Sequence, residues 1–270
     1  MTETESTTLQ GKVHALMPEL TADLVRLSSI PSIASAGFPR EPLLEAHELV
    51  VELLRDAGVE QIDTLSLPDT APVVVGEIPA PPGAPTVLLY SHYDVVPAGD
   101  EALWTSPPWR PTERDGALFG RGTSDSKANV VTHVGALRAW NGKPPVGIKV
   151  VIEGQEEVGG GALTTYPPTN PELFRSDAML IADMGSVRPG VPTLTVGLRG
   201  TAQVEISVST LAGAKHSGQY GGAAPDALVV SSTRSPRCTT RTATSPCPAF
   251  AARSGREPRT ATRSSARSPR

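Results

Sequence analysis

Apolar side chains recur every three or four residues in the first part of the chain, which is the spacing of a helix with one buried face. Residues 8–29 and 42–57 both follow this pattern. Pro31 and Gly58 supply stop signals just after them. A third stretch, 127–140, also gathers its valines and leucines on one side. The pattern predicts an amphipathic helix over each of the three ranges.

Short continuous apolar runs alternate with these helices, which is typical of strands buried on both faces. Residues 79–85 are rich in proline and glycine, as a hairpin turn or an edge loop would be. Alternating strands and helices predict an α/β fold with a sheet covered by helices on both faces. The predicted strands are 71–78, 85–91, 147–157 and 178–183.

A histidine and several carboxylates follow the ends of these apolar runs. His92 and Asp94 are two residues apart in an extended segment, so their side chains point the same way. Binding sites in such sheets form where strands end. Imidazole and carboxylate groups are zinc ligands, so a metal site is predicted here. The other carboxylates at such positions are Asp125, Glu156, Glu157 and Asp183.

A two-zinc hydrolase needs ligands of this kind, including one carboxylate that bridges the metals, and a general base. The base takes a proton from the metal-activated water and passes it to the leaving amine. Each short motif alone is common by chance in proteins. The prediction therefore depends on their combination.

Charge is distributed unevenly along the chain. Nine arginines and one acid fall in residues 233–270, so residues 1–232 carry a net charge of −12. An acidic body disfavours nucleic acid as a partner. No apolar run is long enough for a transmembrane helix, and no signal peptide is visible, so we expect a cytoplasmic protein without a membrane partner. Both cysteines lie in the tail, which leaves the body without thiolate ligands.

Three segments, read with their flanks, resemble the signature motifs of metallopeptidase family twenty. They are the stretch from Ser91 to Ala128, EGQEEVGG (153–160) and LIADMG (180–185). The resemblance covers about residues 10–230. The family includes carnosinase-like dipeptidases, aminoacylases, succinyl-diaminopimelate desuccinylase and glutamate carboxypeptidases.

The resemblance implies two Zn²⁺ ions, with Co²⁺ or Mn²⁺ as substitutes. It implies that His92 and Asp183 bind one metal, that Asp125 bridges the pair and that Glu157 binds the other. Asp94 corresponds to the carboxylate that orients the histidine ligand.

The resemblance also implies residues that act on the substrate. Glu156 corresponds to the general base. His216 corresponds to a lid histidine that contacts the substrate or the transition-state oxyanion, often across a dimer. The other histidines, His14, His47 and His133, are expected to be ordinary helix or packing residues.

The sequence departs from the family pattern in three places. Ala128 replaces a usual glycine, and Gln155 stands where an acid is common. The family's second zinc also takes a histidine from the far C-terminal part of the catalytic domain, and no histidine follows His216. The site with Asp125 and Glu157 is therefore expected to lack a ligand.

Three segments are expected along the chain. Residues 1–198 are predicted to form an incomplete catalytic domain, and residues 199–232, with an alternating strand over 201–210 and a helix from about Ala224, begin a smaller α+β lid domain. Residues 233–270 have Phe250 as their single large apolar residue, so we predict disorder and attribute the segment to an out-of-frame reading of the gene.

The expected activity is metal-dependent hydrolysis of a peptide or amide bond in a small substrate, as in a dipeptidase. An N-acyl amino acid deacylase or desuccinylase is an alternative, and so is a non-catalytic, truncated fragment. A nucleic-acid binder acting through the Arg-rich tail is a further hypothesis. The expected partners are a small peptide or N-acyl amino acid and, in the intact family, a second subunit of a homodimer.

Overall fold

The computed structural model describes residues 3–188, 190–200 and 207–234. The chain divides into two compact units, Met1–Val196 and Gly197–Arg270. The described part of the second unit contains two short helices, α5 (Ser217–Tyr220) and α6 (Ala227–Arg234). The strand expected over 201–210 falls mostly outside the described residues, as does nearly all of the tail 233–270. The three predicted segment boundaries stay predictions.

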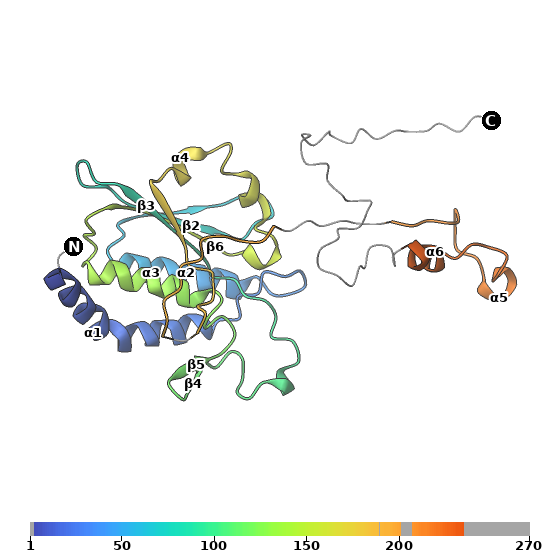
Figure 1. Ribbon diagram of the computed structural model, residues 1–270, viewed down its shortest axis with the longest axis horizontal. Coiled ribbons are helices and arrows are strands. Elements are labelled where there is room, and N and C mark those ends of the chain that lie inside the picture. Colours follow the sequence, from blue (N-terminus) through green and yellow to red (C-terminus); the bar gives the residue numbers. More distant parts are fainter. Residues whose placement is uncertain (1–2, 189, 201–206, 235–270) are drawn as a thin grey trace. The chain divides into compact units, whose positions relative to one another are not determined.

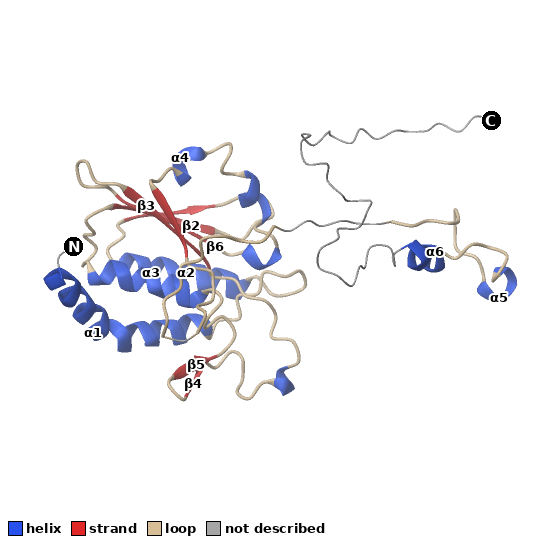
Figure 2. Cartoon of the chain, in the orientation of Figure 1, coloured by secondary structure: helices blue, strands red, loops and turns tan. Residues whose placement is uncertain are grey.

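The first unit is an α/β domain with a mixed five-stranded sheet, which confirms the predicted fold class (Figures 1 and 2). The strand order is β1-β2-β6-β3-β7; β3 runs parallel to both of its neighbours, and the other pairs are antiparallel. The strands are β1 Gln61–Leu65, β2 Val73–Ile78, β3 Thr86–His92, β6 Gly147–Glu153 and β7 Ala178–Ile181, with a separate hairpin of β4 Thr112–Arg114 and β5 Ala117–Phe119.

Three long helices cover one face of the sheet (Figure 1). They are α1 (Glu3–Ser28), α2 (Glu41–Asp56) and α3 (Lys127–Ala139), close to the predicted ranges. Alternate strand residues such as Leu89 and Val150 pack with them in the main core. The other face has a smaller core, in which Leu88 and Val151 pack with the short helices Gly161–Thr165 and α4 (Pro171–Phe174).

Two details of the sheet differ from the sequence-based expectation. Strand β6 lies between β2 and β3, so the turn 79–85 does not close a hairpin of neighbouring strands, and the hairpin alternative is wrong. Strand β1 was not predicted, because its side chains are mostly exposed and give no apolar run. The parallel pairing of β3 with β6 places the ends of both strands at the same edge, with His92 opposite Glu153.

Candidate metal centre

His92 ends strand β3 with its imidazole fully buried. Its side chain follows Leu88 and Tyr90 on the face of the sheet away from the three long helices, because side chains two apart on a strand share a face. The Nδ1 atom lies 3.1 Å from the carbonyl oxygen of Asp94 and 3.2 Å from Oδ1 of the same residue. Nδ1 is therefore engaged by Asp94, which leaves Nε2 as the atom available to a metal.

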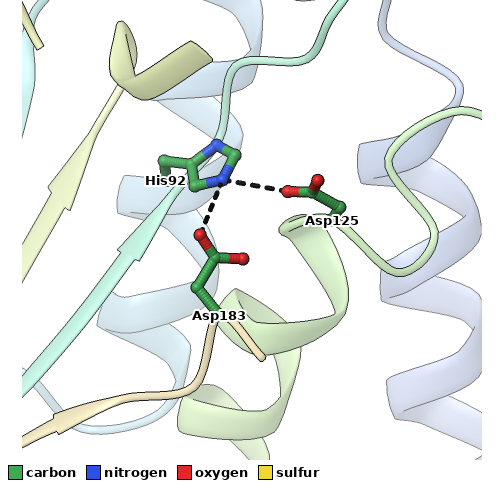
Figure 3. Close-up of side chains that lie close together, drawn as sticks. All are labelled: His92, Asp125 and Asp183. Carbon is green, nitrogen blue, oxygen red and sulfur yellow. Dashed lines mark hydrogen bonds and ion pairs between the residues drawn. The ribbon is translucent and has the colours of Figure 1, made fainter. Parts of the chain in front are cut away.

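Two carboxylates approach this second nitrogen (Figure 3). Oδ1 of Asp125 lies 3.1 Å from Nε2 of His92, and Oδ2 of Asp183 lies 3.5 Å from it. Asp125 precedes helix α3, and Asp183 follows strand β7. The three donor atoms lie within 4.8 Å of one another. The fold thus brings together three residues that are 33 to 91 positions apart in the chain.

Hydroxyl groups hold the Asp125 segment against the end of β3. The Ser91 and Ser126 hydroxyl oxygens are 2.9 Å apart, and both side chains are buried. Asn129 donates to the Ser126 hydroxyl from the first turn of α3. The peptide bond between Asp125 and Ser126 is cis. These contacts fix the approach of Asp125 to His92 from one side.

Glu156 and Glu157 lie in a short 3-10 helix, Glu156–Val158, just after β6. Both backbone N–H groups donate to Asp94: that of Glu156 to Oδ1 and that of Glu157 to Oδ2, each at 3.1 Å. Asp94 is itself completely buried. One carboxylate therefore orients the histidine and also fixes the backbone that carries both glutamates.

The electrostatics of the site reflect many acids around one imidazole. Burial lowers the pKa of His92, but the hydrogen bond and charge of Asp94, together with Asp183 and Glu156, outweigh it and raise that pKa to about 9. Burial is the largest cause of a raised pKa at Glu156, Glu157 and Asp183, although His92 opposes it at each. A divalent cation would offset this concentration of negative charge.

The donor set fits zinc or a similar ion. An imidazole nitrogen and two carboxylate oxygens converge, and the histidine is held by a second carboxylate behind it, which is the usual arrangement at metal sites. In the described residues, the three-residue cluster does not include Glu157. Its proposed role at a second metal stays a prediction. His216 belongs to the second unit, and its predicted contact with substrate also stays a prediction.

Several buried polar residues near the site were not singled out from the sequence. Tyr90 donates to Oε1 of Glu153 at 2.5 Å, and Oε2 of Glu153 has no hydrogen-bond partner among the described residues. Burial raises the pKa of Glu153. Lys127 is fully buried and donates to the backbone oxygens of Leu27 and Ile30 at the end of α1. Glu153 could have been noticed because it ends β6 as His92 ends β3.

His47 and His133 lie outside the metal cluster and make contacts between helices and the sheet. His133 is buried on α3, and its Nε2 lies 3.1 Å from the carbonyl oxygen of Tyr90. His47 on α2 lies 3.1 Å from the hydroxyl of Thr64 and meets the ring of Tyr93 edge-on. Both contacts tie helices to the sheet, in agreement with their expected packing roles.

The fold and the site define an α/β domain with a candidate metal centre at its strand ends. The model of Peptidase family M20/M25/M40 matches residues 88–253, and the chain belongs to this family. It is 48% identical over 187 residues to the cysteinylglycine-S-conjugate dipeptidase of Corynebacterium striatum, covering 68% of this chain and 41% of that protein.

Solved structures of relatives show the same fold. The human carnosine dipeptidase 1 structure has a TM-score of 0.60 and 29% identity, covering 66% of this chain and 41% of that one. The dipeptidase Dug1p of Saccharomyces cerevisiae has a TM-score of 0.71 at 23% identity, covering 87% of this chain and 53% of that one. The chain thus spans about half, or less, of the length of these relatives. Among the described residues, no helix combines the length and apolar character that crossing a membrane requires.

Proposed function

We propose that this chain carries the metal-binding half of a zinc-dependent dipeptidase. The convergence of His92, Asp125 and Asp183 on one point is the observation that carries the proposal. Family membership and the similarity to a cysteinylglycine-S-conjugate dipeptidase support peptide hydrolysis. We assign one metal to these three residues. Glu157, together with Asp125, is assigned to a second metal.

A bound zinc ion lowers the pKa of a coordinated water, so that a nucleophile is present near neutral pH. The protein's own residues supply the remaining functions. Asp94 holds the His92 ring with Nε2 directed toward the two acids. Glu156 accepts a proton and passes it to the leaving amine. Its side chain is partly buried, and this burial raises its pKa.

The names of the relatives suggest the first substrates to test. Cysteinylglycine, its S-conjugates and β-alanyl-histidine form a suitable panel. An N-succinyl amino acid is added to represent the deacylase alternative. If only the succinylated substrate is hydrolysed, the result would favour the deacylase alternative over the dipeptidase.

The test uses the full 270-residue chain, stripped of metal and reloaded with Zn²⁺ or Co²⁺. Glu156→Gln keeps the side-chain shape and removes the base, so hydrolysis should fall at least about 100-fold. Glu113→Gln, on the exposed β4–β5 hairpin, is the matched control and should hydrolyse normally. Equal activity of the Glu156→Gln protein would contradict the assignment of the base. Absence of turnover in the metal-loaded wild type would favour the non-catalytic fragment.

A further inference from the structure

The loop formed by residues 154–162 carries Glu156 and Glu157 and is held on two sides. We call it the acidic loop. Asp94 holds it on one side through the two backbone N–H groups described above. The other side contacts residues 68–72, the segment just before strand β2, which we call the outer segment. The contacts on this second side have no part in the metal site or in the proposed reaction.

The side chain of Gln155 makes the first contact between the acidic loop and the outer segment. Its Oε1 accepts a hydrogen bond from the backbone N–H of Ala71 at 2.8 Å. Its Nε2 donates to the backbone oxygen of Asp69 at 3.4 Å. The amide thus uses both a donor and an acceptor. An ionised glutamate at this position would keep the first bond and would place an oxygen against the Asp69 carbonyl.

The side chain of Thr70 makes the second contact. Its hydroxyl donates to the backbone oxygen of Pro68 at 2.9 Å and accepts from the backbone N–H of Ala162 at 2.9 Å. Thr70 is buried, so these bonds form in a poorly hydrated place. A Cβ atom at Gly161 would lie 2.7 Å from the same hydroxyl oxygen. Glycine at position 161 allows this close approach.

The outer segment is itself tied to the metal-binding strand. Tyr93, between His92 and Asp94, is fully buried, and its hydroxyl donates to the backbone oxygen of Pro72 at 2.6 Å. The Tyr93 ring also fills the space in which a side chain at Gly154 would lie. The residues that hold the acidic loop from outside are therefore anchored to the segment that carries the histidine ligand.

We propose that Gln155 and Thr70 are positioning residues that fix where the carboxylates of Glu156 and Glu157 stand relative to His92. They act through the backbone of the acidic loop and touch neither metal nor substrate. The catalytic consequence rests on the proposed function, but the clamp itself does not. Release of the clamp should free the loop while the rest of the sheet keeps its structure.

The experiment combines amide hydrogen exchange with metal binding on the full chain. Thr70→Val removes both hydroxyl bonds with little change of shape, and Gln155→Glu removes the donor to Asp69. Each should speed exchange of the amides in 156–162 about tenfold in the metal-free protein, without changing exchange in α3. Each should also weaken Co²⁺ binding by about tenfold, because Glu157 lies on the released loop.

Three variants serve as controls. Thr70→Ser keeps the hydroxyl and should restore wild-type exchange and metal binding. Thr132→Val and Gln10→Glu make the same chemical changes at exposed helical positions and should leave the acidic loop unaffected. If the chain hydrolyses dipeptides, Thr70→Val and Gln155→Glu should lower kcat more than they raise KM. Both variants misplace the general base, whereas binding of the substrate in its ground state stays unchanged.

Two results would overturn the clamp. One is acidic-loop exchange and Co²⁺ affinity equal to those of the matched controls. The other is faster exchange throughout α3 and the sheet, which would indicate a general loss of stability. If the wild type neither binds Co²⁺ nor hydrolyses a dipeptide, the proposed function fails, and the exchange rates in the acidic loop still decide whether Gln155 and Thr70 hold it.

Discussion

Oδ1 of Asp94 lies 3.2 Å from Nδ1 of His92, with both side chains completely buried. The same carboxylate accepts the backbone N–H groups of Glu156 and Glu157. Two segments that are more than 60 residues apart in sequence therefore share one buried anion. Removing its charge should disturb the metal ligand and the acidic loop together.

Asp94→Asn tests this double role. Asparagine has the same shape, but its amide nitrogen is a hydrogen-bond donor. One of the two backbone N–H groups that Asp94 accepts would therefore lose its acceptor. We expect Co²⁺ affinity to fall about 10- to 100-fold. The free energy of unfolding should fall by about 1–3 kcal/mol, because a buried donor loses its partner. Co²⁺ titration and urea unfolding measure the two effects.

Asp100→Asn is the matched control for this change. Asp100 is exposed and caps the 3-10 helix Glu101–Leu103 by accepting the N–H of Ala102. Asparagine caps helices about as well as aspartate, so metal binding and stability should stay close to wild type. An Asp94→Asn protein indistinguishable from this control would show that the Asp94 charge is not needed.

Metal binding should release a proton from His92. Its pKa of about 9 in the metal-free chain means that the imidazole is protonated at neutral pH, whereas a metal binds the neutral form. Apparent Co²⁺ affinity should therefore rise about tenfold per pH unit up to about pH 9 and then level off. Calorimetric titrations in buffers of different ionisation enthalpy should show about one proton released per ion. A pH-independent affinity would contradict the protonated histidine.

Lys127 should make the metal-free chain more stable as the pH rises. Burial lowers its pKa from 10.5 to about 7, against the smaller opposing effects of Asp94 and Glu45. Between these two values the unfolded chain binds a proton that the folded chain does not, so the contribution of this residue to stability increases with pH. Below pH 7 both states hold the proton, and the cost of the buried charge is fully present.

Lys127→Met removes this dependence while keeping a long side chain. The wild type should gain stability relative to the variant as the pH rises from 7 to 10.5. Urea unfolding curves at several pH values give the difference. The variant also leaves the backbone oxygens of Leu27 and Ile30 without their shared donor, which lowers its stability by an amount that does not change with pH and leaves the slope unaffected. Stability curves that run parallel across this range would contradict the lowered pKa.

Gly154 should tolerate no side chain. A Cβ atom there would overlap the buried ring of Tyr93, so Gly154→Ala should cost about 1–3 kcal/mol of unfolding free energy. Gly11 lies in helix α1 with nothing within 4 Å of a built Cβ, and alanine favours a helix by roughly 1 kcal/mol over glycine. Replacing glycine by alanine should therefore lower the free energy of unfolding at position 154 and raise it at position 11. Chemical denaturation measures both, and equal effects would show that Tyr93 can move aside.

Much of the fold followed from local patterns. The helices α1, α2 and α3 were predicted because their apolar residues keep the helical spacing through each element. Strand β1 was missed because an exposed edge strand has no apolar run to mark it. The hairpin alternative for 79–85 failed because the strand between β2 and β3 comes from 147–153, and a turn signal does not reveal which strands pair.

The candidate site was predictable in part. The strand-end positions of His92, Asp125 and Asp183 indicated ligands, but the resemblance to a family was needed to give them roles. Glu153 shares only a strand-end position with His92, and Lys127 gave no signal of its own, because isolated charged residues are usually solvated. Only their burial in the fold sets them apart.

The sequence by itself determined the elements and the chemical groups, because helical and strand spacing and the supply of carboxylates and histidines are local properties of the chain. Only the tertiary structure decided that β3, β6 and β7 end at one edge, that Asp94 serves both His92 and the acidic loop, and that Gln155 and Thr70 join this loop to the outer segment. Those outcomes depend on strand order and on contacts between distant segments. Such contacts are fixed when the whole domain buries its apolar surface, and no short stretch of sequence encodes them alone.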